Sequence, residues 1–143
     1  MKTEGLEYAM KMTNELAFSI DKKHWDVVLI DKLGSLQKLF VHMIRVRNTY
    51  CEGLKSGNIS FPGNLPSPEI NIQVELRNSC AILLDNFKTC TYKHITFNGS
   101  RLTIDEVYSM TVQHEGIHQG QFSIALKTKG IQLPETWITD WHL

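Results

Sequence analysis

The chain has 143 residues, the size of one ordinary domain, and its 15 basic and 15 acidic side chains give a formal net charge of zero. A duplex-binding protein carries a basic face, so this balance argues against nucleic acid as a partner. No uninterrupted apolar segment approaches the ~18 residues of a membrane span, so no membrane partner is expected either. We therefore expect a single domain over residues 1–143, with a core that needs no disulfides or structural metal.

The number and spacing of the cysteines bear on the redox compartment. There are three, an odd number that fits no CxxC spacing and follows no secretory apolar region. Such thiols are typical of reducing compartments, in which disulfides are rare. The protein is therefore expected to be cytoplasmic, with Cys51, Cys80 and Cys90 reduced.

The first half of the chain contains two segments in which apolar residues recur at helical spacing. The first predicted helix runs from about Glu4 to Ile20, with Thr3 available to cap its amino terminus. The second carries an apolar face from Leu36 to Leu54. It is ended by the loop of residues 55–66, which is rich in glycine and proline.

A third helix is predicted to begin at Ser67-Pro68-Glu69, which combines a capping hydroxyl, a proline at the first helical position and an acid in the first turn. The apolar face of this helix runs from residue 72 to residue 87. Residues 92–99 then predict a short extended piece and a turn, too isolated to form a sheet.

The spacing of Thr103 and Glu106 is that of a capping box, which opens a fourth helix expected to stop at Gly130. Each of the four helices has one apolar face, and it can bury that face only against the other helices. The predicted fold class is therefore all-α, a four-helix bundle. A short C-terminal helix is expected from about residue 134, where it would lay Trp137 and Trp141 on the bundle or on a second subunit.

Two histidines of the fourth helix, His114 and His118, are spaced to share one ligand. Residues four apart on a helix lie one above the other, so two imidazoles can converge on a single ion. On the helical wheel both side chains fall in the arc that faces the bundle interior, flanked by Ile117 and Ile124. Buried ring nitrogens need partners, and a metal ion or a hydrogen-bonded core pair would supply them equally well.

A zinc or nickel ion bound in this way needs a third protein ligand. His42 is the one further histidine within a predicted helix, at the edge of the apolar face of the second helix. Neighbouring helix axes about 8–10 Å apart leave room for three imidazoles around one ion. An ordinary, partly exposed histidine is the alternative at this position. The remaining histidines, His24, His94 and His142, fall in loops or at the terminus.

The run from His114 to His118 also satisfies the zinc-peptidase pattern HExxH, in which Glu115 would be the general base. The extended form of that motif needs a glycine and a third histidine where Gln121 and Ile124 stand. On the wheel Glu115 falls to one side of the two histidines, which suits a flanking role. These departures argue against a peptidase.

The sequence around these histidines resembles the DinB-like superfamily, also called DinB/YfiT-like metalloenzymes. The likeness is carried by His42 within residues 36–43 and by the octapeptide of residues 114–121, His-Glu-Gly-Ile-His-Gln-Gly-Gln, which is similar to the family's HxxxHxGQ signature. It extends over residues 5–130. The resemblance implies an up-down-down-up bundle and a homodimer. It also implies a divalent ion, nickel or zinc, held by His42, His114 and His118, with Gln121 bordering the site.

The resemblance also implies an activity, because the bacillithiol S-transferases and mycothiol-dependent isomerases of this family use the metal to activate a low-molecular-weight thiol. Three protein ligands leave a coordination position open, where the cation favours deprotonation of a thiol. We therefore expect a thiol S-transferase-like enzyme that adds such a thiol to a small electrophile. No catalytic side chain is assigned beyond the ligands, although Arg45, Tyr50 and Thr111 could line a cavity.

Two alternatives to the transferase stay open. A metal-dependent hydrolase would use the same centre to activate water. A non-catalytic metal-binding or dimeric interaction protein would have the ion closed off by protein. An open cavity beside the three imidazoles would favour catalysis over a closed site.

Overall fold

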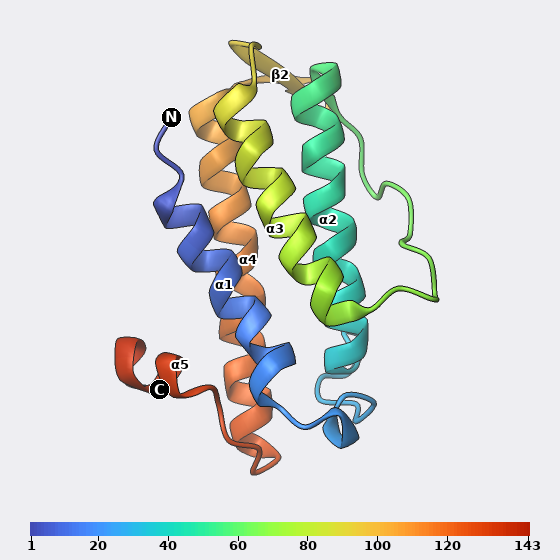
Figure 1. Ribbon diagram of the computed structural model, residues 1–143, viewed down its shortest axis with the longest axis vertical. Coiled ribbons are helices and arrows are strands. Elements are labelled where there is room, and N and C mark those ends of the chain that lie inside the picture. Colours follow the sequence, from blue (N-terminus) through green and yellow to red (C-terminus); the bar gives the residue numbers. More distant parts are fainter.

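The computed structural model describes all residues, Met1–Leu143, and is mostly helical (Figure 1). Its long helices are α1 (Glu4–Ser19), α2 (Leu36–Ser56), α3 (Ile72–Thr89) and α4 (Ile104–Thr128). A short 3-10 helix, η1 (Lys22–His24), follows α1, and a short helix, α5 (Glu135–Trp141), follows α4. In Figure 1 the four long helices lie side by side, and α1 and α4 run opposite to α2 and α3. None of these helices combines the length and the apolar character that a membrane crossing requires.

The prediction of an all-α fold is wrong in one respect, because the chain also forms a three-stranded sheet at one end of the helices (Figure 1). Strand β2 (His94–Phe97) pairs antiparallel with β3 (Ser100–Thr103) and parallel with β1 (Asn58–Ile59). The hairpin turns at Asn98-Gly99, whose φ angles of 49° and 75° are those that the Asn-Gly pair adopts in tight hairpins.

The sequence does not predict the sheet, because β1 lies in the loop after α2, far in the sequence from its partner β2. Gly57 ends α2 with a φ of 81°, a left-handed conformation that turns the chain directly into β1. The side chains of Ile59 and Ile95 are then buried together against the helices. The segment of residues 92–99 is therefore not isolated, and burial of these two side chains stabilises it.

Helix α3 does not begin at Ser67-Pro68-Glu69 as predicted. It begins at Ile72, and the side chain of Asn71 caps it by accepting a hydrogen bond of 3.1 Å from the backbone N–H of Val74. The hydroxyl of Ser67 instead accepts from the N–H of Glu69, a local turn that the same side-chain chemistry permits. By contrast, the predicted capping box of Thr103 and Glu106 is confirmed.

The core consists of two apolar clusters separated by polar side chains. One cluster lies toward the end that holds Trp25 and Trp137, and the other lies toward the sheet. Helix α4 supplies Val107 to the second cluster and Phe122 and Leu126 to the first, and between them it buries only polar residues. The candidate site lies at this polar level of the molecule.

The C-terminal helix docks on the bundle, as the tail's apolar bulk predicted. The side chain of Trp137 is fully buried, and its indole N–H donates to the carbonyl of Met12 at 3.0 Å. The side chain of Trp141 is 55% exposed and donates to the hydroxyl of Tyr8. Trp137 therefore anchors α5 through burial and a hydrogen bond, whereas the half-exposed Trp141 adds a hydrogen bond at the surface.

Candidate metal centre

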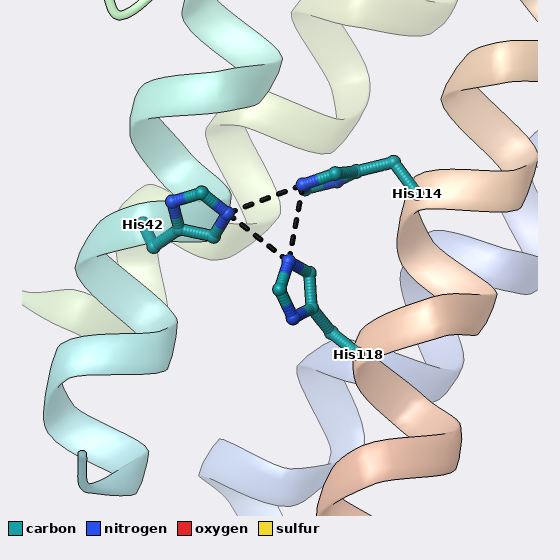
Figure 2. Close-up of side chains that lie close together, drawn as sticks. All are labelled: His42, His114 and His118. Atoms are coloured by element: carbon teal, nitrogen blue, oxygen red, sulfur yellow. Dashed lines mark hydrogen bonds between the residues drawn. The ribbon is translucent and has the colours of Figure 1, made fainter. Parts of the chain in front are cut away.

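The structure brings His42, His114 and His118 together (Figure 2). The Nε2 atom of His42 lies 3.1 Å from the Nε2 atoms of both other residues, and those two are 3.2 Å apart. The three rings are partly buried and turn their Nε2 atoms toward one common point. The sequence spacing alone predicts that the two histidines of α4 lie together, and the fold adds the ring of His42 to them.

The packing of the helices explains this convergence. Helix α2 packs mainly on α3, and α4 packs mainly on α1, while side chains of α2 and α4 meet between these two pairs of helices. The imidazoles of α4 are one helical turn apart, and His42 approaches both from α2 (Figure 2). The cluster therefore lies between α2 and α4, the same two helices that the ion pair of Arg47 and Glu115 joins.

The three nitrogens fit a divalent ion. With metal–nitrogen bonds of about 2.0–2.1 Å, neighbouring ligand atoms are roughly 2.9 Å apart in an octahedral site and roughly 3.3 Å apart in a tetrahedral one. The separations of 3.1–3.2 Å observed here lie between these values. The cluster could therefore hold a metal ion without rearrangement of the helices.

The protonation of His118 also suits a ligand. Its Nδ1 lies 3.0 Å from the amide oxygen of Gln121, which can only accept a hydrogen bond. The Nδ1 atom therefore carries the proton, and the Nε2 lone pair of the neutral ring points at the common point of the cluster. A hydrogen bond of this kind fixes the tautomer and orientation of a metal-ligating histidine.

The electrostatics keep two of the rings neutral. Burial lowers the pKa of His114 to about 3, with a further contribution from the neighbouring rings of His118 and His42. Burial also lowers the pKa of His42, assisted by His118 and by the guanidinium of Arg45. Both rings are therefore unprotonated at neutral pH, which is the form that binds a metal.

Glu115, between the two histidines of α4, does not border the cluster as a flanking residue. Its side chain is 1% exposed and forms an ion pair with Arg47, which is equally buried, at 2.8 Å. The second carboxylate oxygen accepts from Arg47 at 3.1 Å and from the hydroxyl of Thr13 at 2.5 Å. With both oxygens occupied, Glu115 is not placed to act as the base of an HExxH peptidase.

The sequence contained a signal for this pair that was overlooked. Arg47 lies four residues after Met43 and three before Tyr50, so it stands in the middle of the apolar face of α2. A charged side chain at such a position requires a buried partner of opposite charge. The guanidinium finds further acceptors in Asn14 of α1 and in the carbonyl of Leu76 of α3, so the network joins all four long helices.

A pocket of about 140 Å³ adjoins the cluster. Its lining includes His42 and His118, together with two lysines and three apolar side chains. The other residues considered for a cavity do not line it. Tyr50 and Thr111 are buried in the interior, and Arg45 donates two hydrogen bonds to the carbonyl of Gly63, which ties the loop after α2 to the helix.

The cysteines play no part in the cluster. All three are free, and no disulfide is formed. Burial raises the pKa of Cys51 to about 12 and also raises the pKa of Cys80. At neutral pH these two thiols are therefore protonated and are not nucleophiles.

The comparison with known proteins agrees with the fold. No family model matches the sequence, and no curated protein matches it either. Among solved structures, the chain is similar to the crystal structure of a DinB-like protein, YjoA, from Bacillus subtilis. The TM-score is 0.69 at 21% identity, over 87% of this chain and 90% of that one. The chain therefore has a DinB-like fold, as the resemblance of its histidine motif predicted.

Proposed function

We propose that the protein is a divalent-metal-dependent enzyme of the DinB-like superfamily, an up-down-down-up four-helix bundle with His42, His114 and His118 as the metal ligands. The observation that carries this proposal is the convergence of three Nε2 atoms at 3.1–3.2 Å. Nickel and zinc are the proposed ions, because imidazole nitrogen suits both. Three protein ligands leave at least one coordination position for a substrate.

We propose that the reaction is the transfer of a low-molecular-weight thiol to a small electrophile. The thiol gives its proton to solvent, its sulfur forms a bond to the electrophilic carbon, and any leaving group departs with the electrons of the broken bond. A divalent ion at the cluster supplies the positive charge that stabilises the thiolate at neutral pH. The chain itself holds the imidazoles of His42 and His114 neutral through their lowered pKa values, and it orients His118 through Gln121.

Two observations support an external thiol substrate. The buried thiols of Cys51 and Cys80 have raised pKa values, so the chain does not supply a thiolate of its own from either residue. The pocket beside His42 and His118 offers a way to the cluster for a small molecule. An ion closed off by protein, as in a purely structural site, would have no such pocket.

The first test is elemental analysis of the purified protein. We expect about one nickel or zinc ion per chain in the wild type and far less in a His118→Ala variant. A matched variant, His94→Ala, changes an exposed histidine of β2 and should keep the ion. Equal, negligible metal content in all three proteins would contradict the metal centre.

The second test separates the possible reactions. Metal-loaded protein is incubated with several low-molecular-weight thiols and a chromogenic electrophile, and we expect turnover that His118→Ala lacks. Turnover of ester, amide or phosphoester substrates without any thiol would instead identify a metal-dependent hydrolase, which is the alternative function. A stoichiometric ion with neither activity would leave a non-catalytic metal-binding protein.

We also propose that the protein forms a homodimer. The outer face of α4 carries Ile117 and Ile124, which are 51% and 71% exposed, although the wheel had placed them beside the interior. A second copy that covers these side chains would remove apolar surface from water. Light scattering coupled to gel filtration should give twice the chain mass, and an Ile117→Glu/Ile124→Glu variant should give the mass of one chain.

A further inference from the structure

The pocket beside the histidine cluster has walls of two kinds. Leu39 and Phe122, which are almost fully buried, form its apolar base, and Leu33 extends this surface toward solvent. Lys32 and Lys38 supply the charged part of the wall, and no acidic side chain lines the pocket. A ligand pocket is commonly about 300–1,000 Å³. This one, at about 140 Å³, admits only a small molecule or one end of a larger one.

The two lysines are held in place by the loop before α2. Lys32 has a φ of 68°, and Gly34 has a φ of 91°. A Cβ atom on Gly34 would lie 2.8 Å from Cδ of Lys38, so the missing side chain lets the stem of Lys38 cross the loop. The ammonium group of Lys38 then donates to the carbonyl of Lys32 at 3.3 Å, which brings both residues to one side of the pocket.

The titratable side chains that line the pocket are two lysines and two histidines. The carboxylate that acts electrostatically on His42 is Glu115, and its charge is already balanced by the buried guanidinium of Arg47. Imidazole binds a metal as a neutral donor, so three such ligands would leave both charges of a divalent ion uncompensated. Two ammonium groups then add to the positive potential at the mouth of the pocket, which favours an anion.

We infer that the substrate bound in this pocket is a small thiol that carries a carboxylate group. Its sulfur lies toward His42 and His118, its carboxylate lies toward the ammonium groups of Lys32 and Lys38, and a short aliphatic stem contacts the apolar base. The inference rests on the proposed function, because it takes the histidine cluster as the place where the sulfur binds. It adds the class of thiol, which the cluster alone does not determine.

The inference is tested by binding rather than by activity. The 143-residue protein is loaded with Co²⁺ in place of nickel or zinc, and the ligand-field and thiolate charge-transfer absorption bands report the metal site and the binding of sulfur. Three thiols of similar size are titrated: 3-mercaptopropionate, 2-mercaptoethanol and cysteamine, which are anionic, neutral and cationic at neutral pH. We expect 3-mercaptopropionate to bind most tightly and cysteamine most weakly.

The decisive comparison uses a Lys32→Gln/Lys38→Gln variant. Two exposed ion pairs of ordinary strength together change an affinity by about 2- to 30-fold. The variant should therefore reduce the preference for 3-mercaptopropionate over 2-mercaptoethanol by about 2- to 30-fold. Intrinsic differences between the thiols, including chelation of the ion by the carboxylate, are the same in both proteins and cancel. A Lys55→Gln/Lys88→Gln variant makes the same change in net charge at two exposed lysines that do not line the pocket and should keep the preference.

The outcomes distinguish this inference from the proposed function. If the protein shows no ligand-field bands that depend on His118, the metal centre fails and the thiol site fails with it. If Co²⁺ binds and the thiols bind, but the lysine variant keeps the full preference for the anionic thiol, the inference is overturned and the metal centre stands. Loss of the preference in the pocket variant alone supports the inference, and the preference should also weaken at high salt.

Discussion

Glu115 and its two neighbouring histidines on α4 differ in how their polar atoms are satisfied. The carboxylate of Glu115 is 1% exposed, and every oxygen has a partner among Arg47 and Thr13. The Nε2 atoms of His114 and His118 instead meet each other and His42 at a common point. Each Nε2 atom is either an N–H donor or a lone-pair acceptor, so the three mutual contacts cannot all be hydrogen bonds.

This difference separates a polar cluster whose hydrogen bonds are complete from one that could hold a metal ion. A buried ion pair whose hydrogen bonds are complete has no capacity left for a ligand, and it fixes the position of α4 against α1 and α2. A cluster of converging lone pairs gains its partner only when an ion or another ligand enters. The ion pair of Arg47 and Glu115, called the rigid pair below, therefore holds in place the segment of α4 from which the two histidines project.

The largest expected effect is on the rigid pair. An Arg47→Met variant leaves the carboxylate of Glu115 buried without its partner, which costs about 3–5 kcal/mol of unfolding free energy. In metal-free protein, His118→Ala should cost less than about 1 kcal/mol, because that ring is partly exposed. Urea denaturation in the presence of a chelator measures both.

An Arg47→Met/Glu115→Leu double variant serves as the control for this prediction. It replaces both charges by apolar side chains, so much of the lost stability should return. If the single Arg47→Met variant unfolds at nearly the same urea concentration as the wild type, the pair does not hold the helices as described.

The second expected effect concerns the histidine cluster. A ligand that binds only the folded state at a concentration of 1,000 times its dissociation constant raises the unfolding free energy by about 4.1 kcal/mol. We expect a stabilisation of this order when zinc or nickel is added to the wild type, and most of it should be absent in His118→Ala. Thermal unfolding with and without the ion measures the difference, and a His94→Ala variant that also lost the stabilisation would indicate binding elsewhere.

The same comparison explains how much the sequence could predict. The helical spacing and the capping box of Thr103 and Glu106 are local signals, and they located α1, α2 and α4 within a few residues. The pair of histidines on α4 was local as well. His42 was found because only one other histidine lay in a predicted helix, and the structure places it beside that pair.

What the sequence did not predict depends on contacts between distant segments. Strand β1 consists of two residues within a loop, and only its pairing with β2, more than 30 positions later, defines it. The partner of Glu115 lies 68 residues away in the sequence, so the wheel of α4 could not show that this residue points into the core. Lys32 reaches the pocket from a loop whose left-handed residues have no helical or strand periodicity, and it lies beside Lys38 of the first turn of α2.

A smaller effect on metal affinity is expected from substitution of Gln121, which orients a proposed ligand and does not itself bind the ion. Its amide oxygen accepts the Nδ1 proton of His118, and loss of such a partner lowers metal affinity by about 10- to 100-fold. Because Gln121 is exposed, we expect the Gln121→Leu substitution to lower the metal affinity by about 10-fold, the lower end of this range. Competition with a chromophoric chelator measures the affinity.

Two further variants control for this effect. Gln121→Glu keeps an acceptor at the same place and should retain the affinity. Gln113→Leu removes an exposed amide from the same helix without touching a histidine and should leave the affinity unchanged. An unchanged affinity in Gln121→Leu would show that the hydrogen bond does not orient the ring.

The last expected effect is a pH dependence of the metal-free protein. Burial holds the pKa of His114 at about 3 in the folded state, against 6.5 for an ordinary histidine. Between these values the unfolded chain takes up a proton at this residue and the folded chain does not, so the stability that the wild type has above pH 6.5 is lost as the pH falls. A His114→Gln variant has no such group, so its unfolding free energy should decline less between pH 6.5 and pH 4. Parallel pH profiles for the two proteins, measured by urea denaturation with a chelator present, would mean that the ring is free to protonate in the fold.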